Sequence, residues 1–141
     1  MEVDDLFRVN TEPMMLLYKK YVREDKGIRG LTIDDLFAMF FDCNVTVSID
    51  QISLVFGMSK QTVVNDNEEK GQAALQKMQF VEFLEFIGRI SMVKFLGTEM
   101  EELSLTTKIA YIMDDMFPLV GLSRNEVQIE EEEVSESDTE Y

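Results

Sequence analysis

Residues 78–90, MQFVEFLEFIGRI, share a pattern with residues 31–40, LTIDDLFAMF, which begin 47 positions earlier. When the two stretches are aligned, they match at five apolar positions and one acidic position. The matched pairs are Leu31 with Met78, Ile33 with Phe80, Asp35 with Glu82, Leu36 with Phe83, Phe37 with Leu84, and Phe40 with Ile87. Because the apolar residues recur at helical spacing, each stretch predicts an amphipathic helix after a short extended entry. We therefore expect two copies of one helix–loop–helix unit, paired back to back through Leu31 and Met78.

Each repeat is preceded by a second predicted helix. In residues 11–22, Thr11 fits an N-cap and Pro13 fits the first turn. Ahead of the second repeat, Ser48 and Gln51 have the spacing of a capping box. The apolar face of that helix would consist of Ile49, Ile52 and Phe56.

A fifth helix is expected after the second repeat. Gly97 is the expected stop of the helix over roughly residues 80–95. The fifth helix should begin at Thr98, which has Glu101 three residues on, and should end at Pro118. Residues 59–77 are polar and predict a long loop. The fold class is therefore all-α.

These elements predict one domain with a charged extension. The tail holds eight acidic residues and no basic ones in residues 126–141, which predicts disorder. Ser135 and Ser137 each have an acid three residues on, so both are hypothetical sites for an acidophilic kinase. The expected parts are an N-terminal segment over 1–13, the helix–loop–helix pair over 14–97, a C-terminal helix packing on the pair over 98–123, and a disordered acidic tail over 124–141.

Composition excludes several classes of function. The net charge of −15 disfavours binding to nucleic acid or to an anionic membrane surface. With one cysteine and no histidine, neither a disulfide, a structural zinc site nor a Cys/His nucleophile pair is expected. No phosphate-binding or catalytic motif is present, and so we expect no catalytic residue, cofactor or small-molecule substrate. The absence of a signal-peptide pattern and of a long apolar run predicts a soluble, cytoplasmic protein.

Asp35 and Glu82 each occupy the position of the last ligand in a twelve-residue calcium loop. The other ligand positions are unsuitable for a hard cation. Positions 1, 3 and 5 hold Glu24, Lys26 and Ile28 in the first loop, and Gly71, Ala73 and Leu75 in the second. Starting the second loop at Asp66 instead would put lysines at positions 5 and 12.

No metal site is therefore expected in either loop, although a weak, nonspecific divalent site in the loop or tail stays open. The alternative role for Asp35 and Glu82 is to stabilise a helix N-terminus, where negative charge is favourable.

Four stretches carry a resemblance to a known family: LLYKKYV (16–22), GLTIDDLFAMFFDC (30–43), VTVSIDQISLVF (45–56) and MQFVEFLEFIGRISMVKF (78–95). Together they resemble the EF-hand superfamily with degenerate loops. More narrowly, they resemble modules of the tubulin-polymerization-promoting-protein family and of related ciliary and flagellar proteins. The resemblance spans roughly residues 14–96. It implies a paired EF-hand fold, like one half of calmodulin, and a non-enzymatic role with microtubules or an axonemal complex.

The acidic charge favours a calcium-independent adaptor or structural subunit over direct bundling of microtubules, whose outer surface is also acidic. The expected partner is a protein, axonemal or tubulin-associated, and the expected location is a cilium, flagellum or the cytoskeleton. Two alternatives stay open: a calcium sensor that binds a target helix, and an acidic regulatory subunit unconnected to cilia.

A partner-binding groove is a further hypothesis. Five apolar residues lie partly off the predicted core stripes: Phe41, Phe86, Met92, Val93 and Phe95. Flexible methionines and large aromatic residues suit a groove for a partner helix. The alternative is that the fifth helix covers these residues within the fold.

Overall fold

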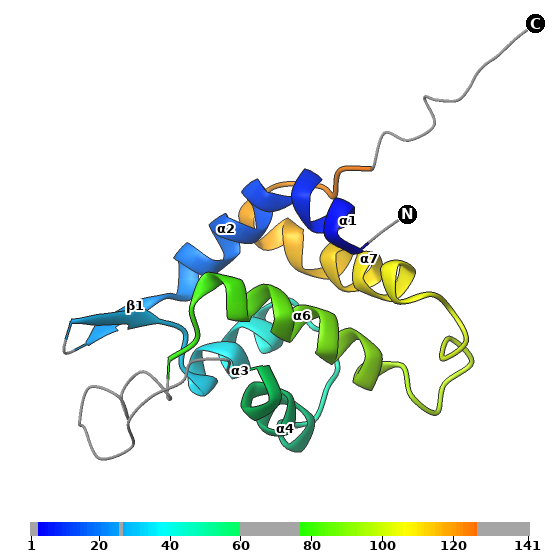
Figure 1. Ribbon diagram of the computed structural model, residues 1–141, viewed down its shortest axis with the longest axis horizontal. Helices are drawn as coiled ribbons and strands as arrows, with labels where there is room; N and C mark the ends of the chain where they lie inside the picture. The colour runs from blue at the N-terminus through cyan, green and yellow to red at the C-terminus, as the bar shows by residue number, and fades with distance from the viewer. Residues whose placement is uncertain (1–2, 26, 60–76, 127–141) are drawn as a thin grey trace, which may run out of the picture.

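The computed structural model describes residues 3–25, 27–59 and 77–126. These residues are mostly helical, as expected, with one small antiparallel sheet (Figure 1). The elements are α1 (Val3–Val9), α2 (Thr11–Tyr21), β1 (Arg23–Asp25), β2 (Ile28–Gly30), α3 (Ile33–Asp42), α4 (Ile49–Ser59), α6 (Phe80–Lys94), α7 (Leu105–Met116) and the 3₁₀ helix η1 (Phe117–Val120).

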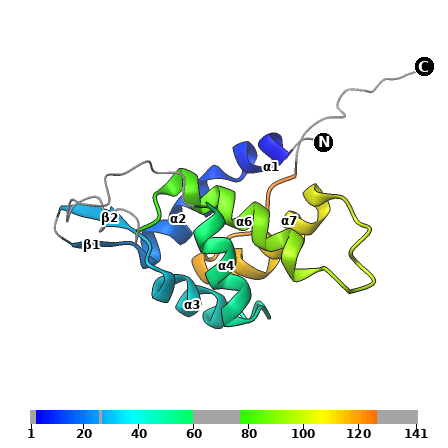
Figure 2. The same ribbon diagram turned by 60° about the horizontal axis from the view of Figure 1, so that its bottom comes forward.

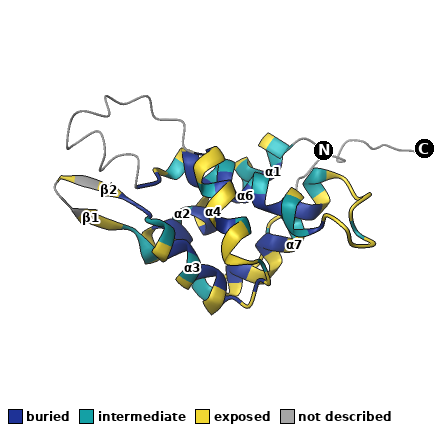
Figure 3. Ribbon diagram, turned by 90° about the horizontal axis from the view of Figure 1, so that it is seen from below, coloured by how far each residue is buried: buried dark blue, intermediate teal, exposed yellow. Residues whose placement is uncertain are grey.

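Helix α6 is the centre of the arrangement. It packs against α4 on one side and α7 on another, and it also contacts α2 (Figures 1 and 2). Most of the residues predicted to form core stripes are buried, on the inward sides of the helices (Figure 3). Ile49 is an exception, because 65% of its surface is exposed.

The expected pairing of Leu31 with Met78 is confirmed. These residues form an isolated antiparallel bridge, in which the Leu31 N–H donates to the Met78 carbonyl (2.9 Å) and the Met78 N–H donates to the Leu31 carbonyl (2.7 Å). Both side chains are fully buried. The Tyr18 hydroxyl of α2 also donates to the Met78 carbonyl (3.3 Å). The bridge therefore joins the entries of α3 and α6, as the repeat predicts.

Two predicted helix starts are confirmed by their caps. At α3, the Asp35 N–H donates to the Thr32 hydroxyl (3.2 Å), and the Thr32 N–H donates to the Asp35 carboxylate (2.9 Å). At α4, Ser48 and Gln51 make the same reciprocal pair of bonds, at 3.0 Å each. Each pair satisfies two backbone donors that the first turn of a helix leaves open.

The predicted start of the fifth helix at Thr98 is wrong, because residues 98–104 form turns. The Glu101 carboxylate accepts from the Gly97 N–H (3.0 Å), and the Thr98 hydroxyl donates to the Phe95 carbonyl (2.7 Å). These bonds tie residues 97–101 back to the end of α6. Helix α7 begins after Ser104, whose hydroxyl accepts from the Thr107 N–H (3.2 Å).

Strands β1 and β2 are a further departure from the all-helical expectation. They pair antiparallel, with Arg23 opposite Gly30 and Glu24 opposite Arg29. Gly27 in the connection has a φ of +79°, a left-handed conformation that glycine adopts without strain. Gly27 therefore lies in the turn that joins the two strands.

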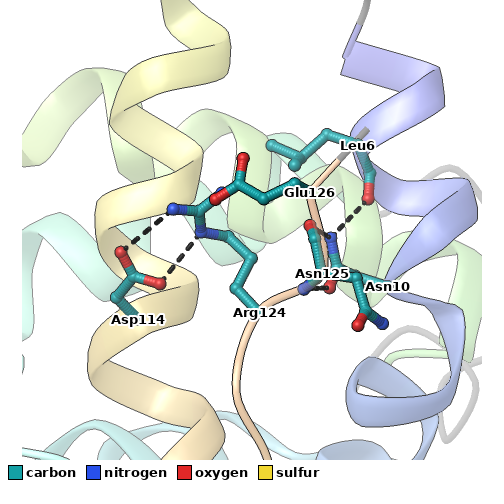
Figure 4. A network of polar contacts seen from close by, with 6 residues as sticks. All are labelled: Leu6, Asn10, Asp114, Arg124, Asn125 and Glu126. Atoms are coloured by element: carbon teal, nitrogen blue, oxygen red, sulfur yellow. Dashed lines mark hydrogen bonds and ion pairs between the residues drawn. The ribbon is translucent and has the colours of Figure 1, made fainter. Parts of the chain in front are cut away.

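The two ends of the described part of the chain contact each other. Helix α1 lies within the expected N-terminal segment over 1–13, and Asn125 lies within the tail expected to be disordered from residue 124. The Asn125 N–H donates to the Asn10 side-chain carbonyl (2.7 Å), which ties the start of the predicted tail to the residue that follows α1 (Figure 4). Ser135, Ser137 and the rest of the tail lie outside the described residues.

Candidate protein-interaction surface

Asp35, in the last ligand position of the first loop, is used within the fold. It is 1% exposed. Besides the Thr32 N–H, its carboxylate holds the Arg23 guanidinium, with Nε 2.7 Å from Oδ1. Buried carboxylates are costly unless paired and hydrogen-bonded, and Asp35 is both.

Glu82 has the equivalent position at the start of α6. It is 5% exposed, and its Oε1 accepts from the Gln79 N–H (2.9 Å). The Gln79 side chain in turn donates to the Arg29 carbonyl of β2 (2.7 Å). Both repeats therefore turn their acid toward the helix N-terminus, which is the alternative role predicted from the sequence.

The remaining ligand positions fall partly outside the described residues. Glu24 lies in β1, paired with Arg29 in the hairpin ladder. Lys26, Gly71, Ala73 and Leu75 lie outside the described residues, as does Asp66. Within residues 3–25, 27–59 and 77–126, no three Asp, Glu or Cys side chains gather in a way that could hold a metal ion.

Two of the five predicted partner-binding residues are buried. Phe86 is 0% exposed, and its ring lies 5.8 Å from that of Phe40 between centroids. Phe95 is 7% exposed and its ring lies 6.3 Å from that of Tyr111 on α7. The groove hypothesis is therefore wrong for these two residues. The alternative prediction is that the fifth helix covers these residues within the fold. It holds for Phe95, which packs against α7.

The other three do not share one groove. Val93 is partly buried against the core. Phe41 and Met92 line two separate surface hollows that have no lining residue in common. The structure therefore divides the predicted groove into two surface sites and a buried part.

The first site, which we call the α3–α4 hollow, lies between the end of α3, the linker and the start of α4. Its volume is about 480 Å³. Phe41 is 83% exposed and Ile49 is 65% exposed at its edge. Its inner wall is apolar and consists of Phe37, Phe40, Val45, Val47 and Ile52.

One polar side chain of the α3–α4 hollow is fixed in place. Asp42 accepts a hydrogen bond from the Tyr21 hydroxyl of α2 (2.5 Å). Burial, and then this hydrogen bond, raise the pKa of Tyr21 well above its usual range. Tyr21 therefore stays protonated at neutral pH and continues to donate to Asp42.

The second site, which we call the α1–α6 hollow, has a volume of about 460 Å³. Val81 and Met92 of α6 are its exposed apolar residues, at 67% and 50%. Its lining also includes Arg89 and Glu85, whose side chains form an ion pair (2.6 Å). This hollow thus contains charges of both signs.

A polar contact joins the two ends of the described chain (Figure 4). Asn10 is 0% exposed and its side-chain amide donates to the carbonyls of Leu6 (2.9 Å) and Asn125 (3.1 Å). The Arg124 guanidinium lies beside Asp114 of α7 (2.9 Å), which raises the pKa of Arg124. The contact between Asn10 and Asn125 was not predicted from the sequence. A single asparagine has no periodic or repeated signal that would identify a partner far along the chain. Its bonds are all internal, and we interpret it as structural.

Cys43 is a further residue whose side chain could be chemically reactive. Burial raises the pKa of its thiol to about 11. Since the thiolate is the nucleophilic form, this cysteine is unreactive at neutral pH.

No helix in the described part of the chain is both long enough and apolar enough to span a membrane. Comparison of the chain with protein-family models, with curated proteins and with solved structures finds no match in any of the three.

Proposed function

We propose that this chain is a degenerate EF-hand pair that acts as a calcium-independent protein-interaction module without catalytic activity. The observation that carries this proposal is the use of both loop-end acids, Asp35 and Glu82, as buried caps of helices. A working calcium loop needs its last carboxylate as a bidentate ligand. Here that carboxylate already serves the fold without a metal.

The pairing of two helix–loop–helix units is supported by the order of the elements. Helices α2 and α3 flank the first loop, and α4 and α6 flank the second. The bridge between Leu31 and Met78 joins the two loops at equivalent positions of the repeat. Surface hollows lined by exposed apolar residues support the interaction role, since such patches commonly mark protein-binding sites.

The setting we propose is a ciliary, axonemal or other microtubule-associated complex, in which the chain is an adaptor or structural subunit. This setting rests on the resemblance of residues 14–96 to ciliary EF-hand-like modules. The strong negative charge supports a place in a complex through a protein partner, rather than direct contact with the acidic surface of microtubules. An acidic regulatory subunit unconnected to cilia is the competing proposal.

Thermal unfolding with 1 mM calcium or with a chelator tests calcium independence. A sensor site with a Kd of about 10 µM would gain roughly 2.7 kcal/mol of stability at this concentration. We expect the same midpoint in both conditions. A rise with calcium but not with an equal concentration of magnesium would contradict the proposal, whereas an equal rise with both ions would indicate a weak, nonspecific divalent site.

Affinity capture from extract of ciliated cells, with and without calcium, tests the interaction role. We expect axonemal or tubulin-associated proteins, identified by mass spectrometry and recovered equally in both conditions. Partners that appear only with calcium would favour the sensor class. Equal capture of the same partners from non-ciliated cells would favour the regulatory subunit.

A further inference from the structure

The α3–α4 hollow combines an apolar wall with an acidic edge. Residues 31–59, which contain both helices and the linker, include four aspartates and no lysine or arginine. Asp35 is neutralised by Arg23, which leaves Asp34, Asp42 and Asp50 exposed. The exposed charges that α3, the linker and α4 contribute are therefore all negative.

These aspartates lie close to the apolar residues of the hollow. Asp34 is on the same face of α3 as Ala38 and Phe41, which line the hollow, since the three are spaced at i, i+4 and i+7. Asp50 follows Ile49 directly at the start of α4. Asp42 itself lines the hollow. A ligand bound there would meet carboxylates along α3 and at the start of α4.

Among the described residues, no lysine or arginine lines the α3–α4 hollow, and the ammonium of Lys94 bonds to the linker. Lys94 of α6 reaches the linker, where its ammonium donates to the Thr46 carbonyl (3.3 Å) and lies 5.3 Å from the centre of the Phe95 ring. Neither Thr46 nor Phe95 lines the hollow. The described lining of the hollow therefore includes a carboxylate, that of Asp42, and no basic side chain.

We propose that the α3–α4 hollow binds a basic segment of a partner protein, which inserts a bulky apolar side chain between Phe41 and Ile49. This inference rests on the proposed interaction function and names the chemistry of the partner. The volume of about 480 Å³ lies within the usual range for a binding pocket. Lysines or arginines beside the inserted side chain would face Asp34, Asp42 and Asp50.

A second copy of this chain is a poorer occupant. Each copy carries a net charge of −15, and the same acidic edges would face each other in a symmetric dimer. The α1–α6 hollow is less suited to select a basic partner. Its lining contains side chains of both charges, including Arg89 and Glu85, which form an ion pair.

The test uses a synthetic amphipathic peptide of leucine and lysine with a single tryptophan on its apolar face. The chain contains no tryptophan, so the emission of the peptide alone reports burial of that side chain. A matched peptide carries glutamate in place of every lysine. We expect the lysine peptide to bind the full chain with a blue-shifted emission, and the glutamate peptide not to bind.

Two double variants locate the site. Phe41→Ala with Ile49→Ala removes the exposed apolar residues of the α3–α4 hollow. Val81→Ala with Met92→Ala removes those of the α1–α6 hollow and is the matched control. Since all four side chains are at least half exposed, both variants should fold, which circular dichroism will verify. We expect the first variant to raise the Kd about 10- to 30-fold and the control to change it less than about twofold.

A third variant tests the charge. Asp34→Asn with Asp50→Asn leaves the apolar wall intact and should weaken binding several-fold while reducing its salt dependence.

Three results would overturn the inference: no binding of the lysine peptide, equal loss in both apolar variants, or equal binding of the glutamate peptide. Dimerisation that Phe41→Ala with Ile49→Ala abolishes, seen by sedimentation, would instead assign the hollow to a second copy. If the peptide experiment fails but affinity capture still recovers partners, only the assignment of the α3–α4 hollow is refuted and the proposed function is retained. Failure of the capture experiment counts against that function.

Discussion

Replacing Gly30 with alanine tests how the two halves of the fold are joined. Gly30 ends β2 and precedes Leu31, which bridges to Met78. A Cβ at residue 30 would lie 2.8 Å from the Met78 carbonyl oxygen and 2.9 Å from the Lys77 Cβ. Real Cβ atoms avoid contacts this short, so the added methyl must push the two segments apart.

The cost follows from what that movement disrupts. Breaking the two bridge hydrogen bonds would lose about 1–3 kcal/mol, and steric overpacking costs about 1–3 kcal/mol in addition. The lower entropy of alanine in the unfolded chain offsets about 0.4–1 kcal/mol. We therefore expect Gly30→Ala to lower the free energy of unfolding by roughly 1–6 kcal/mol, with about 3 kcal/mol at the middle of that range.

Gly57→Ala is the matched control. Gly57 lies inside α4, and a Cβ there meets nothing within 4 Å. The same chemical change should stabilise this site by about 0.5–1 kcal/mol, because alanine is the better helix former. Urea unfolding followed by circular dichroism compares the two variants. If Gly30→Ala proves as stable as the wild type, the bridge does not couple the two units as argued.

Three other substitutions address single features. Asn10→Ala should lower the free energy of unfolding by roughly 1–3 kcal/mol in urea, because it removes the hydrogen bonds of the buried Asn10 side chain to the Leu6 carbonyl and to the Asn125 backbone. Ser104→Ala should cost about 1 kcal/mol in urea unfolding through the loss of the α7 cap, and a variant as stable as the wild type would contradict this helix start. The neutral Cys43 thiol stabilises the fold up to about pH 9, and this contribution of roughly 2–3 kcal/mol should disappear as the pH rises through the folded pKa of about 11. Unfolding free energies of the wild type and Cys43→Ala at pH 8 and pH 11 measure it, and an identical fall in both proteins would contradict this assignment.

The helices and their pairing could be predicted where the signal is local or repeated. The alignment of Leu31 with Met78 identified a contact across 47 positions, because the same unit occurs twice in the chain. Ser48 and Gln51 predicted a helix start, since a capping box lies within four residues. Thr98 and Glu101 have the same spacing, yet their side chains bond back to α6 and form turns. Tertiary context decides between these two outcomes.

The surface hollows could be predicted only in part. Phe41 and Met92 were selected because they lie off the core stripes, and both are exposed. Phe86 was selected on the same ground but is buried, because α6 is surrounded by helices on several sides and buries more than one stripe. The spacing predicts Ile49 on the apolar face of its helix, yet it is exposed. Spacing within one helix does not show how far along its length the adjacent helices cover that face.

The contact between Asn10 and Asn125 has a consequence for biosynthesis. The two residues are 115 positions apart, so α1 leaves the ribosome long before its hydrogen-bonding partner exists. At about 5–20 residues per second, the delay is roughly 6–23 s. During this interval the Asn10 side chain can bond to the Leu6 carbonyl but lacks its partner Asn125. Helix α1 can pack on α7 only after residues 105–116 have been synthesised, and the bond to Asn125 follows later still.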